Sequence, residues 1–291
     1  MINHHAVVAR AQLDEAELAA VLELAEICTV HDGRPIKLNP GMLRSRPGDQ
    51  TDDFLFYQDG RLVGFLGMYR FKPGEIEVSG MVHPAYRRRG VFTALYAAAR
   101  RSCMERAIPA MLWICERHSA PGKAFLQSLG SAYSFSEYVL KLDPAALPPL
   151  SPSELDIRPA TAADAALIGD LMAAGFGMEP ADTGQFLDKE KNRPDRNLMV
   201  ASRAGQPFAV IGAQSLPEGA YIYGFVVAAE ERGRGYGRQI LLHTVHDLVA
   251  AGQSAISLEV AVDNERALGL YQACGFREAS ANDYYTLPLG S

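Results

Sequence analysis

The sequence lacks the features that would mark a membrane, secreted or metal-binding protein. It contains no uncharged apolar run of about 18 residues, so we expect no membrane-spanning helix. Its first twenty residues show no basic segment followed by an apolar one, so they predict no secretory signal. The four cysteines form no CxxC pair and no metal-ligand spacing. They predict buried free thiols in a cytoplasmic protein that holds no metal.

An excess of basic residues is also missing. The net charge is −6, and it is unevenly shared: residues 1–145 carry 17 basic and 16 acidic side chains, whereas residues 146–291 carry 11 and 18. An acidic half speaks against nucleic acid as a partner and favours a cationic one, although an ordinary solvated acidic surface is the alternative interpretation. The length of 291 residues and the apolar content of 48% are typical of two globular domains. We expect a monomer or a homodimer.

An internal repeat is visible when the two halves are superposed without a gap. Residues 78–101 resemble residues 223–246, and residues 112–130 resemble residues 257–275, both at an offset of 145 positions. The segments 136–142 and 282–289 also correspond, as terminal strands of the two halves. A shared offset over this length predicts two copies of one fold.

The boundaries of the two copies follow from composition. Residues 143–155, "DPAALPPLSPSEL", are rich in proline and serine, which is typical of an extended linker. We therefore expect a first domain at 1–144, a linker at 145–155 and a second domain at 156–291. Strands alternate with amphipathic helices in each copy, which predicts an α/β (α+β) fold with a mixed sheet flanked by helices.

The glycine-rich loop of the second copy predicts an anion site. "RGRGYG" (232–237) lies between an apolar run and a periodic, helix-like run, so its backbone N–H groups should converge at a helix N-terminus. Glycine lets a phosphate approach the backbone closely, and arginine adds charge for a diphosphate. The alternative is a tight turn with solvated arginines. The P-loop lysine and the dinucleotide-binding GxGxxG order are both missing.

The loop and a downstream segment together resemble the GNAT superfamily of N-acetyltransferases. Arg232, Gly235 and Gly237 match the Q/R-x-x-G-x-G/A signature of that family. The segment "LEVAVDNERALGLYQACGF" resembles its second motif, with the residues Asn264, Ala267, Tyr271, Gly275 and Phe276 in the family's spacing. The match covers residues 157–289, and residues 1–142 more loosely. It implies acetyl-coenzyme A as the donor.

The resemblance also implies which residues hold the donor. The strand "YGFVVA" should splay from its neighbour and bind the pantetheine arm through its backbone. The implied coenzyme-binding residues are Phe225, Val226, Val227, Arg232, Gly233, Arg234, Gly235, Tyr236, Gly237, Arg238, Asn264 and Tyr271. Tyr271 occupies the position of the family's general acid, which would protonate the departing thiolate. The alternative is that Tyr271 only packs the helix face.

The general base is open between two interpretations. Glu259 precedes Tyr271 by 12 residues, which is similar to ribosomal-protein-type N-terminal acetyltransferases, in which the glutamate acts as base. Because Leu258 and Val260 flank it on a strand, Glu259 faces the opposite side, where it could equally be a solvated residue. The competing base is a water chain that ends at Tyr221 or Tyr223.

The first copy departs from the family pattern. Phe92 replaces the last small residue of the loop, Ser119 stands at the Asn264 position, and the catalytic pair is replaced by Ile114 and Leu126. A second coenzyme site could still form from Val82, Arg87, Arg88, Arg89, Gly90 and Val91. We expect this copy to be mainly structural, in a tandem layout similar to that of mycothiol synthase.

These features predict an N-acetyltransferase. We expect the second copy to move the acetyl group of acetyl-coenzyme A to a primary amine of a small-molecule acceptor, by direct attack in a ternary complex. The alternative is a catalytically silent acyl-coenzyme A sensor or partner-binding protein. The motifs describe the donor side, so they do not identify the acceptor.

Overall fold

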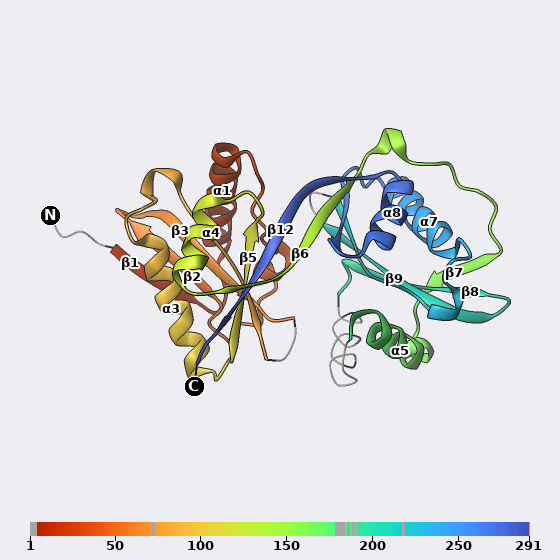
Figure 1. Ribbon diagram of the computed structural model, residues 1–291, viewed down its shortest axis with the longest axis horizontal. Coiled ribbons are helices and arrows are strands. Elements are labelled where there is room, and N and C mark those ends of the chain that lie inside the picture. Colours follow the sequence, from red (N-terminus) through yellow and green to blue (C-terminus); the bar gives the residue numbers. More distant parts are fainter. Residues whose placement is uncertain are drawn as a thin grey trace. The chain divides into compact units, whose positions relative to one another are not determined.

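The computed structural model describes residues 5–71, 74–177, 184, 187, 190, 193–216 and 219–290. The chain divides into two compact units, of which the first comprises residues 1–136 and 280–291 and the second residues 137–279. Figure 1 shows the elements of both. Within the described ranges, no helix is long and apolar enough to cross a membrane. All four cysteines are buried free thiols, which confirms that prediction.

The first unit contains a six-stranded mixed sheet in the order β1-β2-β3-β4-β5-β12. Neighbouring strands are antiparallel except β4 and β5, which are parallel. The strands are β1 (His5–Arg10), β2 (Asp53–Gln58), β3 (Arg61–Tyr69), β4 (Ile76–Val82), β5 (Ala110–Glu116) and β12 (Phe276–Pro288). The helices are α1 (Glu15–Asp32), α2 (Pro40–Arg44), α3 (Val91–Glu105) and α4 (Ala120–Ser128).

The second unit repeats this order, as β7-β8-β9-β10-β11-β6. Here β10 and β11 form the parallel pair. The strands are β6 (Ala132–Leu142), β7 (Leu155–Pro159), β8 (Arg196–Arg203), β9 (Gln206–Leu216), β10 (Gly219–Val227) and β11 (Ile256–Ala261). The helices are α5 (Ala165–Phe176), α7 (Tyr236–Ala250) and α8 (Glu265–Ala273). Two copies of one mixed α/β fold are therefore confirmed.

Each sheet is covered by helices on both faces. Apolar side chains of its strands point alternately to the two faces and pack with the helices on each. In β3, Leu66 and Met68 pack with α3 and α4, whereas Phe65 and Tyr69 pack with α1 on the other face. The second unit repeats this arrangement with α7 and α8 on one face and α5 on the other. The period of two along a strand therefore sends successive side chains into different cores.

The terminal strand of each half completes the sheet of the other unit. Residues 137–141 of β6 pair with β11, and Leu140 and Leu142 lie in the core of the second unit. Residues 282–288 of β12 pair with β5, and Leu287 and Leu289 lie in the core of the first (Figure 1). The structural units thus differ from the predicted domains 1–144 and 156–291, because the apolar alternation of these strands fits either sheet. Residues 147–154, within the expected linker, form no helix or strand.

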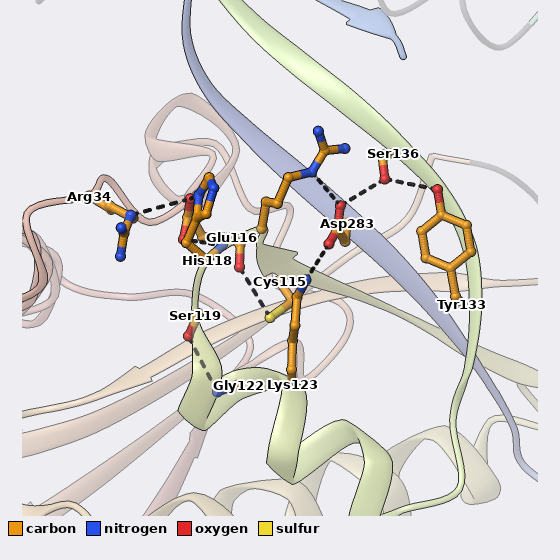
Figure 2. Close-up of polar contacts among 11 residues, drawn as sticks. Arg34, Cys115, Glu116, His118, Ser119, Gly122, Lys123, Tyr133, Ser136 and Asp283 are labelled. Carbon is orange, nitrogen blue, oxygen red and sulfur yellow. Dashed lines mark hydrogen bonds and ion pairs between the residues drawn. The ribbon is translucent and has the colours of Figure 1, made fainter. Parts of the chain in front are cut away.

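Asp283 fixes the exchanged strand in the first unit. This buried carboxylate accepts hydrogen bonds from Arg117 Nε at 3.0 Å and from Ser136 Oγ at 2.7 Å, and it pairs with Lys123 Nζ at 2.8 Å (Figure 2). Burial by itself would raise the pKa of Asp283. The hydrogen bonds from Lys123, Ser136 and Arg117 outweigh it and hold the pKa below its ordinary value. The ionised carboxylate therefore stabilises β12 in place.

The exchange predicts that Asp283→Asn destabilises the first unit. Arg117 and Lys123 lose their ionic partner, which should lower the free energy of unfolding by about 2 kcal/mol. Because the folded pKa is depressed, this stabilisation is present above about pH 4 and is lost as the pH falls. Trp113, the single tryptophan, lies in β5 opposite Tyr285 of β12, so its fluorescence reports thermal unfolding of this unit. The exposed Asp263→Asn is the control, and equal midpoints for both variants would contradict the prediction.

Candidate active site

The second unit has a split between two parallel strands. β10 pairs with β11 through Ala220, Tyr221 and Ile222 and no further, while β11 continues to Ala261 alongside β6. The remainder of β10 stays paired with β9 up to Val227. The backbone of β10 beyond Ile222 thus has no strand partner on its β11 side, as the family resemblance implied. Such an edge can hydrogen-bond an extended ligand.

A bulge sits at the start of the split. The register between β10 and β9 shifts between Tyr223 and Val226, and Gly224 adopts φ 59°, which favours glycine. The corresponding strand β4 pairs with β3 without any shift. Ile222 therefore corresponds to Val78, since these two face Leu258 and Trp113 in their parallel pairs. The gapless superposition at offset 145 is wrong upstream of Gly224, because β10 contains one additional residue there.

The predicted loop forms an anion cradle at the start of α7. Gly235 is the N-cap residue of α7 with φ 81° and ψ 0°, and Gly233 has φ 80°. In the described chain, the backbone N–H groups of residues 233–238 have no backbone acceptor. A Cβ on Gly235 would meet nothing within 4 Å, so the space in front of the loop is open. These N–H groups and the helix N-terminus fit a phosphate.

The three loop arginines each have a contact within the protein. Arg232 Nε donates to the carbonyl oxygen of Val227 at 2.8 Å, and Arg234 pairs with Glu231 at 3.2 Å. Arg238 lies beside Cys274, where its charge opposes the rise that burial causes in the pKa of that thiol, to about 11. Among these contacts only that of Arg234 is with an acidic group, so the arginines add positive charge to that of the backbone N–H groups.

Two residues of the second motif belong to helix α8, Asn264 as its N-cap residue and Tyr271 within it. The side chain of Asn264 caps α8 by accepting a hydrogen bond from Ala267 N at 3.1 Å. Tyr271 is 9% exposed and packs edge-on against Phe276. Burial, and then the charge of Cys274, raises the pKa of Tyr271 to about 12. Its hydroxyl therefore keeps its proton at neutral pH, as a proton donor must.

Glu259 lies next to the split on the face opposite α7 and α8. Its neighbours Leu258 and Val260 are buried among those helices. Glu259 itself is half-buried and accepts a hydrogen bond from the Tyr221 hydroxyl at 3.2 Å. The structure thus joins the two sequence-predicted candidates, the carboxylate of β11 and a tyrosine of β10, in one contact.

A second tyrosine–glutamate pair lies on the same face of β10. The Tyr223 hydroxyl donates to Glu190, whose other oxygen accepts from Arg196 Nη1 at 2.6 Å. Burial, and then the Glu190 carboxylate, raises the pKa of Tyr223. The sequence did not identify Glu190, because "LDKEKNRPDR" contains no motif and shows no link to β10.

The loop of the first unit has the same backbone geometry. Gly90 is the N-cap residue of α3 with φ 80° and ψ 0°, and Arg87 Nε donates to the carbonyl oxygen of Val82 at 3.0 Å. Arg87 also binds Asp32 through two hydrogen bonds of 2.8 and 2.7 Å. The hydrogen bonds from Arg87 are the main cause that lowers the pKa of Asp32 to about 2. The guanidinium charge of Arg87 is thus neutralised within the protein by Asp32.

A cavity of ≈ 650 Å³ adjoins this loop in the first unit. Its lining includes all but one of the residues predicted for a second coenzyme site, namely Val82, Arg87, Arg88, Gly90 and Val91. Arg89 instead contacts the Tyr86 ring. The cavity is thus in the unit that lacks the Glu259 and Tyr271 side chains. The candidate active site therefore lies in the second unit, which has side chains that can exchange protons, since a cavity alone supplies no chemistry.

Polar side chains also line the cavity, among them Arg34, Glu116 and His118, whose contacts are drawn in Figure 2. Glu116 pairs with His118 at 3.1 Å and lies 3.8 Å from Arg34 Nε. Burial raises the pKa of Cys115 to about 11, so its thiol is protonated and a poor nucleophile. Leu126 is buried at the Tyr271 position. Glu77 of β4, which faces Leu112 as Tyr221 faces Ser257, is a carboxylate that the sequence comparison missed because of the one-residue offset.

Each unit has one phenylalanine ring between the helix that follows the loop and the strand that precedes it. The ring comes from the helix in the first unit and from the strand in the second, and a glycine faces it in both. In the first unit, the ring is Phe92 of α3, and a Cβ on Gly80 of β4 would lie 2.9 Å from it. In the second unit the ring is Phe225 of β10, and a Cβ on Gly237 of α7 would lie 3.8 Å from it. Phe92 is therefore not a simple loss of the family's small residue, because a glycine on the facing strand makes room for its ring.

The reciprocal placement of phenylalanine and glycine predicts that two substitutions in the second unit compensate for each other. Gly237→Phe should lower the free energy of unfolding by about 1–3 kcal/mol, because two rings then compete for one space. Phe225→Gly should cost about 3 kcal/mol through lost burial. The double variant should be more stable than the sum of both effects allows. Differential scanning calorimetry measures this coupling, and strictly additive losses would contradict the reciprocal arrangement.

Comparison with known proteins agrees with this geometry. The family model described as "Acetyltransferase (GNAT) family" matches residues 23–130 and 167–276. The mycothiol acetyltransferase of Kineococcus radiotolerans is 29% identical over 285 residues, which cover 91% of each chain. The [ribosomal protein bS18]-alanine N-acetyltransferase of Salmonella typhimurium is 30% identical over 101 residues, which cover 34% of this chain and 68% of that protein.

Solved structures share the fold over the whole chain. A GCN5-related N-acetyltransferase from Sphaerobacter thermophilus superposes with a TM-score of 0.79 at 18% identity, covering 98% of this chain and 96% of that one. A tandem GNAT protein from the clavulanic acid biosynthesis pathway gives a TM-score of 0.78 at 19% identity and 99% coverage of both chains. Since the family model matches both halves, the protein belongs to the GNAT family of acetyltransferases and contains two of its domains in tandem.

Proposed function

We propose that the protein transfers the acetyl group of acetyl-coenzyme A to a primary amine of a small-molecule acceptor, by direct attack in a ternary complex within the second unit. The observation that carries this proposal is that four features occur together in that unit. They are the strand split after Ile222, the cradle at residues 233–238, the protonated Tyr271 and the Glu259–Tyr221 pair.

The donor would be held mainly by the backbone. The N–H groups of residues 233–238 suit the diphosphate, and the free edge of β10 at Phe225–Val227 suits the amide groups of the pantetheine arm. The thioester supplies an activated acetyl group. Asn264 contributes indirectly, since its side chain is used to start α8 and so to place Tyr271.

Two side chains would move protons. The amine must lose a proton before its lone pair attacks, and Glu259 would accept that proton, either directly or through Tyr221. The Tyr271 hydroxyl would give its proton to the sulfur of the departing thiolate. After the attack the nitrogen carries one further proton, which would return to the Tyr271 phenolate as the amide forms. The net products are then the acetylated amine, free coenzyme A and the proton held by Glu259.

The acidic second half supports a cationic acceptor. Residues 146–291 carry 18 acidic and 11 basic side chains, and an ammonium group is attracted to such a surface. The relatives that cover about nine-tenths of the chain are named for mycothiol, a small molecule, which supports a small acceptor over a protein one.

The two loops allow a matched test of which unit works. Gly235→Glu should abolish coenzyme binding and turnover, because a charged side chain on an αL residue fills the cradle and repels phosphate. Gly90→Glu imposes the same strain at φ 80° in the first unit and should leave turnover within about twofold of wild type. Initial rates of thiol release and isothermal titration with coenzyme A measure both. Loss of turnover in Gly90→Glu alone would assign the reaction to the other unit.

The proton-transfer roles predict separable kinetic losses. Tyr271→Phe should lower kcat by about 10²-fold with little change in coenzyme affinity, because only the leaving thiolate loses its proton donor. Glu259→Gln should lower kcat/KM for the amine by a similar factor, and raising the pH should partly restore it as free amine accumulates. Steady-state kinetics from pH 6 to 10 test both. Normal turnover in the phenylalanine variant would remove Tyr271 from the mechanism.

A further inference from the structure

The bulge in β10 coincides with a buried polar cluster that the reaction scheme does not use. We define the clamp as Glu190, Arg196 and Tyr223. The Tyr223 hydroxyl donates to Glu190, Arg196 Nη1 donates to Glu190 Oε1 at 2.6 Å, and the Arg196 guanidinium lies 5.0 Å from the Tyr223 ring centre. The Glu190 side chain is only 7% exposed.

The Tyr223 ring lies directly on the neighbouring strand. A Cβ on Gly212 of β9 would come within 2.6 Å of this ring, so glycine is required there. Tyr223 and Gly212 are also the last matched pair before the register shift, and the next pair is Val226 with Val210. The clamp thus holds β10 against β9 at the residue where the additional Gly224 enters the strand.

The first unit provides an internal comparison. Its residue facing Gly67, the counterpart of Gly212, is Ser79, which donates to the carbonyl oxygen of Lys37 at 2.6 Å. That strand has no tyrosine at this point and no register shift. Clamp and bulge are therefore present together in one unit and missing together from the described strands of the other.

The carboxylate of the clamp is fully engaged, which argues for a geometric role. Both oxygens of Glu190 accept hydrogen bonds, and the Tyr223 hydroxyl directs its proton to one of them. A neighbouring pair has the same character, since Asp195 accepts from Arg193 Nε at 2.8 Å and from Gln214 Nε2 at 2.7 Å. Groups engaged in this way hold a backbone in place more readily than they exchange protons with an amine.

We infer that Glu190, Arg196 and Tyr223 are positioning residues, which maintain the bulge at Gly224 and thereby fix the free edge of β10 that receives the pantetheine arm of the donor. Without the bulge, a one-residue slip would turn Phe225, Val226 and Val227 to the opposite faces of the sheet. The donor role of that edge rests on the proposed function. The structural role of the clamp does not.

The test combines hydrogen exchange with coenzyme binding. In Tyr223→Phe and Glu190→Gln, amide exchange in the peptide covering residues 223–230 should quicken about tenfold, and the dissociation constant for coenzyme A should rise about tenfold, as loss of a charged hydrogen bond implies. Gly212→Ala should have the same effects because it displaces the ring. It should add little in a Tyr223→Val background, where no ring remains.

A matched control separates positioning from general stability. Asp164→Asn removes another charge-assisted pair of the second unit, with Arg158 at 2.8 Å, and neither residue belongs to the clamp or to β10. It should lower the melting temperature as much as the clamp variants without changing exchange at residues 223–230 or coenzyme affinity. Clamp variants that behave like Asp164→Asn would overturn the inference. A wild-type protein that binds no coenzyme would refute the proposed function, while the exchange data would still decide whether the clamp holds the bulge.

Discussion

The candidate site depends on the point where two parallel strands separate. Up to Ile222 and Leu258, β10 and β11 form an ordinary ladder, and beyond it no pair joins the described residues of these two strands. Separation leaves backbone groups that must find partners, since an unmatched buried amide is costly. A ligand with its own amides can satisfy them, and a loop of unpaired N–H groups follows along the chain. The proposed donor site would thus be formed chiefly by backbone groups.

The side chains then distinguish two units with similar backbones. Both have a split sheet and a glycine-capped helix, and the two loops agree within a degree at Gly90 and Gly235. Only the second has a tyrosine on the last helix and a tyrosine–glutamate contact across its split among the described residues. In the first, Arg87 is occupied by Asp32 and the tyrosine is replaced by Leu126. Similar backbone geometry with different titratable groups yields one unit with a tyrosine–glutamate contact at its split and one unit with a cavity at its loop.

The sequence predicted the features that local patterns determine. Alternating apolar residues predicted the strands, and "RGRGYG" predicted a strand-to-helix loop with open N–H groups. The identity of each strand's partner could not be predicted in this way. Residues 137–142 and 281–289 have the same alternation, so either sheet could accept either strand. The bulge could not be predicted for a related reason. The segment "YGFVV" has the pattern of a regular strand, and its additional residue is recognised only from the pairing of β10 with β9. The role of Glu190 could not be predicted either, because it depends on a contact with β10 and no sequence motif links the two segments.

The strand exchange also has a consequence for synthesis. Arg117 and Asp283 are 166 positions apart, so β5 leaves the ribosome long before its partner strand exists. At translation rates of about 5–20 residues per second, the gap is on the order of ten seconds. During that time the first unit has an unpaired apolar edge, while residues of the second unit are still being added. The unit made first is therefore the last to be completed, and nascent chains are most exposed to aggregation during that interval.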